Sequence, residues 1–245
     1  MNQEIGARFD DVTAGRAYSL VDPVEAHEAL SLDDVPLVFE RAVAASRRGL
    51  WVAGYVTYDA APAFDSALVA GGRSGRPFAP SDSPAPLAWF GAFSGRRDEP
   101  SVRGQSDDTR SVGVSPWVPG IDRTAYDTAF STIKKHIAAG DTYQINLTFP
   151  LRAAGGQGPG HLYRLLAASQ ETAHACHMWH GGRHVVSVSP ERFFWSAGNR
   201  IVTRPMKGTR RRGRWPEEDA VHREQLRLSE KDRAENVMIV DLMRN

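Results

Sequence analysis

The stretch RIVTRPMKGTRRRGRWPEEDAVHREQLRLSEKDRAENVMIVDLMRN, residues 200–245, decides the fold class. It begins with a short apolar run at residues 200–203, which predicts a strand, and continues through a basic loop. The spacing of apolar residues then predicts two helices, at 217–228 and 231–245. Successive helices with no strand between them depart from the regular alternation of a parallel α/β fold. The stretch therefore indicates an α+β protein.

The segments that precede this stretch show the same irregular mixture. Two of them, residues 71–86 and 94–116, are rich in turn-forming residues and are expected to be loops. Helices are expected at residues 35–48, 124–139 and 161–169, strands at 51–58, 87–93, 142–151 and 185–195, and a strand-and-turn entry at 9–22. The change in pattern after the second loop predicts two domains, residues 1–115 and 116–245.

Composition excludes several classes of protein. The 245 residues carry a net charge of +1, so the whole molecule has no field that would gather nucleic acid or an anionic membrane. Residues 1–11 lack the pattern of a secretory signal, and no run approaches the roughly 20 apolar residues of a membrane span. Cys176 is the only cysteine, which excludes an internal disulfide framework. We expect a cytoplasmic protein that binds neither nucleic acid nor membrane.

A run of cations in residues 203–214 is the first candidate site. It has three interpretations: a solvated basic loop, a nucleic-acid patch, or an anionic-substrate site in which Lys207 is a reactive amine. The nucleic-acid interpretation is weakened because no aromatic residue occurs before Trp215 and three acidic residues follow it. In the third interpretation, neighbouring cations disfavour the ammonium form of Lys207, and Gly208 lets backbone approach a ligand closely. The cations are Arg204, Lys207, Arg210, Arg211, Arg212 and Arg214.

Two carboxylate patterns are also candidates. Glu191, within Ser189-Pro190-Glu191 and followed by aromatic residues, is either a partly desolvated general acid or a surface charge at a turn. Asp232 and Glu235 are three residues apart and share a helix face, which is how a helix can offer two carboxylates to one Mg²⁺ ion. Their alternative role is to stabilise the helix dipole in the first turn.

A cluster of histidines around Cys176 resembles metal ligands by residue type. The spacing fits no common zinc pattern, and a strand would send His174 and Cys176 to the face opposite His177. We therefore do not expect a metal there. The remaining members of the cluster are His180 and His184.

Four segments taken together, in order and spacing, resemble the chorismate-utilising enzyme family. They are GDTYQINL at residues 140–147, SPERF at 189–193, TRPMKGTR at 203–210 and KDRAENVMIVDL at 231–242. A weaker resemblance reaches back through GYVTYDAA at 54–61 and AWFG at 88–91, and so covers most of the chain. The resemblance implies an α+β fold like that of anthranilate synthase component I, with antiparallel sheets flanked by helices. It also implies that residues 1–115 form the N-terminal subdomain and 116–245 the first part of the chorismate-binding domain.

Two positions indicate a branch within this family. Isochorismate and salicylate synthases typically have a lysine base where this chain has Gln144. Anthranilate synthases typically have alanine where this chain has Lys207, whereas aminodeoxychorismate synthases have lysine and use it as a covalent nucleophile. The resemblance therefore implies synthesis of 4-amino-4-deoxychorismate for p-aminobenzoate and folate, with ammonia supplied by a separate glutamine amidotransferase subunit.

The resemblance also implies a role for each candidate residue. Lys207 would be the nucleophile and Glu191 the general acid, while Gly208, Thr209 and Gln144 would line the substrate site. Glu235 would be a Mg²⁺ ligand, with Asp232 beside it through the waters of the ion.

The chain departs from the family pattern in two places. The family's second half would follow Asn245, so we expect an incomplete catalytic site. Residues 174–176 also differ from the usual tryptophan-binding segment, so bound tryptophan is not expected. The alternatives are an anthranilate synthase, a specialised amino-chorismate or isochorismate synthase, and a non-catalytic fragment.

Overall fold

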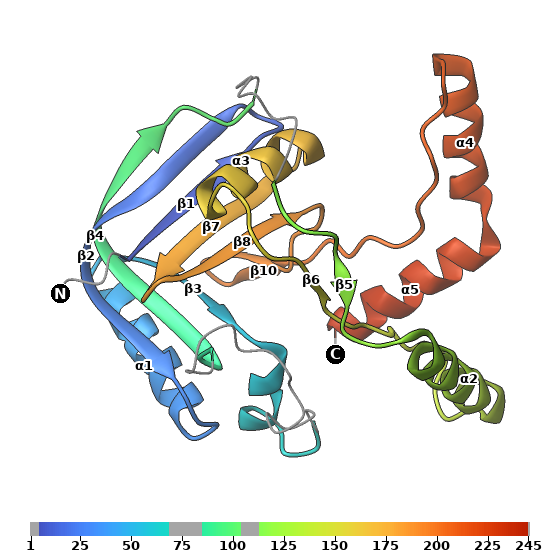
Figure 1. Cartoon of the computed structure of the whole chain (residues 1–245), viewed down its shortest axis with the longest axis horizontal. Helices are drawn as coiled ribbons and strands as arrows, with labels where there is room; N and C mark the ends of the chain where they lie inside the picture. Colours follow the sequence, from blue (N-terminus) through green and yellow to red (C-terminus); the bar gives the residue numbers. More distant parts are fainter. Residues whose placement is uncertain (1–4, 69–84, 104–112, 245) are drawn as a thin grey trace. The chain divides into compact units, whose positions relative to one another are not determined.

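The computed structural model describes residues 5–68, 85–103 and 113–244, and its centre is a six-stranded antiparallel sheet (Figure 1). The strand order is β3-β4-β2-β1-β7-β8. The strands are β1 (Gly6–Asp11), β2 (Arg16–Ala29), β3 (Trp51–Val56), β4 (Ala88–Glu99), β7 (His174–His180) and β8 (Arg183–Ser189). One sheet thus receives strands from both sides of the predicted boundary at residue 115, which itself stays a prediction.

The β2–β4 pair is the longest strand pairing in the sheet. Its register shifts between Pro23 and Glu25, where proline cannot donate a ladder hydrogen bond and a bulge absorbs the irregularity. β2 turns back on β1 in a hairpin, and β1 pairs on its other side with β7, so that Ala7 faces Met178. The end of the sheet formed by β7 and β8 therefore depends on residues far along the chain.

The two faces of the curled sheet have separate cores. On the inner face, Ala7, Leu20, Ala53, Phe93 and Met178 form one buried cluster. On the other face, helix α1 (Asp34–Arg47) inserts Val35 and Val38 against Ala29 and Ala88. Burying such side chains supplies most of the stabilisation of a fold of this kind.

The curl of the sheet brings its outer strand β3 to β7. The Tyr55 hydroxyl lies 2.9 Å from His180 Nε2, and the His180 ring stacks on Trp89 with centroids 4.4 Å apart. These three side chains, which we call the aromatic closure, join the neighbouring strands β3 and β4 to β7, which is adjacent to neither in the sheet order.

Residues 106–165 form a separate compact unit. It contains helix α2 (Arg123–Ala139) and the strand pair β5 (Val118–Pro119) and β6 (Leu151–Arg152). Asp122 caps the start of α2 by accepting a hydrogen bond from the Ala125 N–H at 2.7 Å, and Gly140 ends it in the left-handed conformation with φ 82°. Helix α3 (Pro159–Gln170) begins in this unit and ends outside it.

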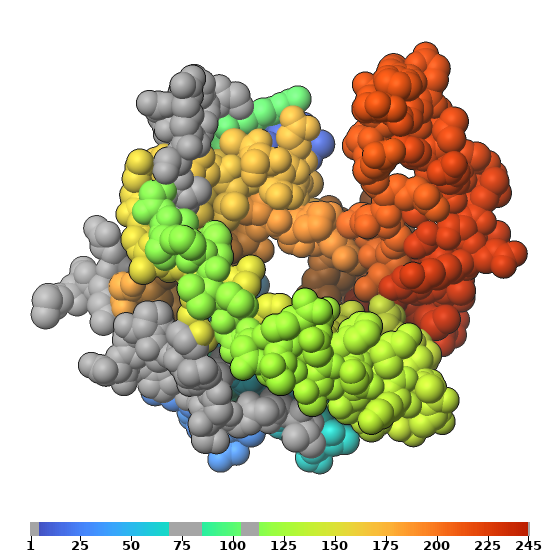
Figure 2. All heavy atoms as spheres, turned by 45° about the vertical axis from the view of Figure 1, so that its right-hand side comes forward, coloured from blue at the N-terminus to red at the C-terminus, as the bar shows by residue number. Residues whose placement is uncertain are grey.

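The C-terminal part of the chain contains a small two-stranded sheet and two helices. The strands are β9 (Trp195–Ala197) and β10 (Arg200–Val202), and the helices are α4 (Pro216–Leu228) and α5 (Glu230–Arg244). α4 and α5 form the red end of the space-filling view (Figure 2) and expose large apolar side chains, with Val237 68% and Leu242 61% exposed. No helix in the described ranges is both long and apolar enough to cross a membrane.

The structure confirms the α+β class and corrects several predicted elements. Residues 142–150 form no strand, and the predicted strand survives only where β6 begins at Leu151. Residues 94–99 continue β4 instead of starting a loop, because charged side chains on a strand's exposed end resemble loop composition. The strand predicted at 185–195 stops at Ser189, since Pro190 ends the ladder. The loop predicted at 71–86 lies mostly outside the described residues.

Candidate active site

The loop after β10, which we call the lysine loop (residues 203–214), carries Lys207 in a half-buried position. Gly208, the next residue, has φ +76°, a conformation that glycine adopts without a Cβ penalty. Thr209 follows it and is exposed. The loop is irregular because proline, glycine and repeated arginine favour neither helix nor strand.

Glu191 lies directly against this loop. One of its carboxylate oxygens accepts a hydrogen bond from the Met206 N–H at 2.8 Å. Met206 precedes Lys207, so this hydrogen bond places the Glu191 carboxylate against the loop segment that carries Lys207. The aromatic residues that follow Glu191 are exposed, Phe193 75% and Phe194 53%, and stack edge-to-face on each other.

Asp232 meets the lysine loop from α5. A Cβ built on Gly208 would lie 3.0 Å from Asp232 Cβ and 3.1 Å from its carboxylate Oδ1. The absence of a side chain at Gly208 therefore leaves the Asp232 carboxylate room beside the loop. Asp232 also belongs to the helix start, where its N–H donates to Ser229 Oγ at 3.3 Å.

Glu235 lies one turn further along α5 and is half-buried. Among the residues that the structure describes, no group of three or more His, Cys, Asp or Glu could hold a metal ion. Mg²⁺ is commonly bound through one or two carboxylates and keeps several waters, so the donor chemistry of Asp232 and Glu235 suits this ion.

The far end of the lysine loop is fastened to α4. Arg212 makes two hydrogen bonds with the Asp219 carboxylate, at 2.7 and 2.8 Å, and these hold the Asp219 pKa below its usual range. The Arg214 N–H donates to Glu218 at 2.6 Å, and this bond lowers the Glu218 pKa. A Cβ on Gly213 would lie 2.1 Å from the Asp219 backbone nitrogen, so only glycine fits there.

This anchoring explains part of the basic run. Arg212 and Arg214 neutralise acidic residues of α4 and contribute little free positive charge to a ligand. Lys207 and Arg204 belong to the part of the loop closer to Glu191. The sequence analysis took the acidic triplet at 217–219 only as evidence against nucleic-acid binding. An acidic triplet directly after an arginine run could also have predicted these ion pairs.

Gln144 is the remaining residue of the predicted substrate site. It belongs to the unit of residues 106–165, where its carbonyl accepts a hydrogen bond from the Thr142 hydroxyl at 3.1 Å. Its place in the substrate site stays a prediction.

The histidine cluster is a packing feature of β7 and β8. His177 Nε2 lies 2.9 Å from His184 Nδ1, and burial, with smaller effects of His184 and Arg8, lowers the His177 pKa to about 4. Burial, with smaller effects of Arg183 and His184, lowers the His180 pKa to about 4 in the aromatic closure. Burial likewise raises the pKa of the Cys176 thiol, which makes this cysteine a poor nucleophile.

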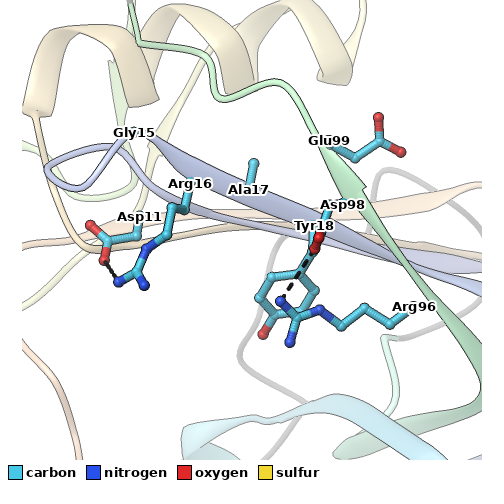
Figure 3. Close-up of a pocket in the computed structure, with 8 residues that line it drawn as sticks. All are labelled: Asp11, Gly15, Arg16, Ala17, Tyr18, Arg96, Asp98 and Glu99. Atoms are coloured by element: carbon cyan, nitrogen blue, oxygen red, sulfur yellow. Dashed lines mark hydrogen bonds and ion pairs between the residues drawn. The ribbon is translucent and has the colours of Figure 1, made fainter.

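A cavity of about 470 Å³ lies where the β1–β2 hairpin meets the end of β4 (Figure 3). Arg96 sits over the Tyr18 ring, 4.1 Å from its centroid, and Arg16 pairs with Asp11 at 3.4 Å. Burial raises the Tyr18 pKa, an effect partly opposed by Arg96. None of the predicted site residues lines this cavity.

Comparisons with known proteins indicate the family of the chain. The chain matches the model of the family described as chorismate binding enzyme over residues 8–245. Anthranilate synthase component 1 of Streptomyces coelicolor is 36% identical over 221 residues, covering 88% of this chain and 39% of the relative. Aminodeoxychorismate synthase component 1 of Klebsiella aerogenes is 38% identical over 132 residues, covering 54% of this chain and 29% of the relative.

A solved structure from Bacillus anthracis, described as a 2,3-dihydroxybenzoate-specific isochorismate synthase, has a similar fold. The TM-score is 0.64 with 18% sequence identity, and the match covers 98% of this chain and 58% of that chain. The chain thus spans less than half the length of the two curated relatives.

Proposed function

The chain belongs to the chorismate-binding enzyme family, and we propose that its protein aminates chorismate to 4-amino-4-deoxychorismate. The observation that carries this proposal is the contact between Glu191 and the lysine loop, which sets a carboxyl group beside the segment that bears Lys207. An amine as nucleophile and a carboxyl group as general acid suit covalent displacement of a hydroxyl group.

The proposed reaction has two steps. In the first, the neutral Lys207 amine forms a bond to ring carbon 2 of chorismate and becomes a secondary ammonium, both ring double bonds shift, and the carbon 4 hydroxyl leaves as water with a proton from Glu191. In the second, ammonia forms a bond to carbon 4, both double bonds return to their original positions, and Lys207 is expelled as the neutral amine. The Glu191 carboxylate then accepts a proton from the new ammonium group. The two steps divide one difficult displacement into two easier ones.

Asp232 and Glu235 would hold Mg²⁺ beside the lysine loop. When bound, the ion supplies positive charge for a substrate carboxylate. The absence of a side chain at Gly208 lets the Asp232 carboxylate lie against the lysine loop. Thr209 and Gln144 are proposed to contact the substrate, and ammonia is proposed to come from a separate glutamine amidotransferase.

A second candidate is anthranilate synthesis. The relative of Streptomyces coelicolor that covers 88% of this chain carries that name. Lys207 favours the first candidate, because anthranilate formation leaves no task for a covalent amine at this position.

Product identification distinguishes the candidates. Chorismate, Mg²⁺ and ammonium are given to the full-length protein, and the products are separated and identified by mass spectrometry. We expect aminodeoxychorismate. Detection of anthranilate would favour the second candidate, and an unchanged chorismate pool would contradict both.

A further inference from the structure

The Glu191 carboxyl is held in place by a short turn at the end of β8. Ser189 is the last residue of β8, and its Oγ donates to the Glu191 carbonyl oxygen at 2.7 Å and accepts the Glu191 N–H at 3.2 Å. One hydroxyl therefore engages both backbone groups of the residue that carries the proposed general acid. Such local serine bonds define the direction in which the chain leaves a strand.

Pro190 further restricts the backbone conformations that this turn can adopt. Its ring fixes φ near −65°, and its presence restricts Ser189 to extended backbone. Extended backbone is what the end of β8 requires, so the strand and the turn share one conformation at Ser189. Few backbone torsions remain free between the sheet and Glu191.

Thr172, which precedes β7, also holds the turn in place. The Thr172 hydroxyl donates a hydrogen bond to the Ser189 carbonyl oxygen and accepts one from the His174 N–H at 3.1 Å. Thr172 is 6% exposed, and its own carbonyl accepts the Val12 N–H at 2.9 Å. Through Thr172, Ser189 is thus connected to the start of β7 and to the turn after β1.

We propose that Ser189 is a positioning residue that aims the Glu191 carboxyl at the Met206 N–H and so at the segment bearing Lys207. The contact that depends on this positioning is the 2.8 Å hydrogen bond from the Met206 N–H to the Glu191 carboxylate. The catalytic consequence rests on the proposed function, whereas the positional consequence does not. If the hydroxyl is lost, Glu191 can rotate with its peptide and leave the loop.

The test measures position without catalysis. In the wild-type chain, the amide resonance of Met206 is expected to move with pH as Glu191 changes protonation, because the carboxylate accepts its hydrogen. Glu191→Gln assigns this effect by abolishing it. Ser189→Ala should reduce the pH-dependent movement at least about threefold, and Ser189→Thr should restore it, since threonine keeps the hydroxyl and favours extended backbone. Ser187→Ala, on the same strand, is the matched control and should leave it unchanged.

Activity is measured on the same variants. Misplacement of a catalytic group by about 1 Å costs up to 10²-fold, so kcat for chorismate amination should fall roughly 10- to 100-fold in Ser189→Ala with KM within twofold. Ser189→Cys, which keeps the shape but has only a weak donor, replaces Ser189→Ala if that variant does not fold.

The outcomes separate the two proposals. An unchanged Met206 titration in folded Ser189→Ala or Ser189→Cys overturns the positioning role. The expected titration changes in a protein that makes no aminodeoxychorismate support the positioning role and contradict the proposed function.

Discussion

Glu191 and Met206 are 15 residues apart in the chain and meet through one hydrogen bond. That contact could not be derived from sequence, because a carboxylate at a turn is more often a solvated charge. The residue types and their order were visible in the sequence, and the family resemblance gave them roles. The contact between Gly208 and Asp232 was likewise invisible, since it depends on how the lysine loop returns to α5.

Lys207→Ala tests the covalent step. The variant has no amine to form a bond to the substrate, so aminodeoxychorismate formation should fall by at least about 10³-fold. Intact-protein mass spectrometry should show a chorismate-derived adduct in the wild type and none in the variant. Lys134→Ala, an exposed lysine on α2, is the control. Full rate in Lys207→Ala would remove the lysine from the mechanism.

Glu235→Gln tests the metal role. In the proposed site Glu235 is one of two carboxylates for Mg²⁺, and its replacement would weaken binding of the ion, so the Mg²⁺ concentration that gives half-maximal turnover should rise about tenfold or more. Glu230→Gln, at the exposed start of the same helix, should leave that concentration unchanged. A magnesium titration of Glu235→Gln that matches the wild type would take this residue out of the site.

At the scale of single elements, the helices were easier to predict than the strands. α1, α2 and α4 lie within a residue or two of their predicted bounds, because apolar spacing and end signals such as Gly49 and Gly140 agree there. β7 was not predicted, since its histidines and cysteine were weighed as ligands. Apolar and polar residues alternate at 142–150, but this segment pairs with no strand among the described residues. The periodicity alone therefore gave a wrong strand prediction.

The buried histidines of β7 make the stability of the fold depend on pH. The pKa values of His177 and His180 are lowered from 6.5 to about 4, so the unfolded chain binds more protons than the folded one between these values. Stability should therefore be highest above pH 6.5 and fall as the pH drops towards 4, by roughly 1–2 kcal/mol per histidine after allowance for partial solvation.

Urea unfolding at several pH values from 7 to 4.5 measures this effect. His177→Gln should flatten the dependence, whereas His136→Gln, an exposed histidine on α2, should not. Equal slopes for the wild type and His177→Gln would show that this histidine does not govern acid stability.

At the scale of the whole sheet, the aromatic closure joins β3 to β7 through Tyr55, Trp89 and His180. Tyr55→Phe keeps the ring and removes the hydroxyl bonded to His180 Nε2. The free energy of unfolding should fall by about 1 kcal/mol, the usual net worth of one hydrogen bond. Chemical denaturation measures the change, and Tyr58→Phe, whose side chain is 82% exposed, is the control. A loss as large for Tyr58→Phe would place the effect outside the closure.

The α+β class followed from element order alone, but the sheet order did not. Nothing in the composition of residues 6–11 indicates that β1 pairs with β7, because pairing partners distant in sequence leave no local pattern. The same limit applies to the aromatic closure, whose members come from three separated segments.

The pairing of β1 with β7 also sets a schedule for biosynthesis. The ribosome must add roughly 160 residues between the end of β1 and the start of β7, which takes roughly 10 to 30 s at ordinary rates of translation. During that interval the β1 edge of the nascent sheet presents unpaired N–H and C=O groups to its surroundings. The growing chain therefore offers a strand-shaped target for chaperones, or for neighbouring copies on a polysome, until β7 emerges and covers it.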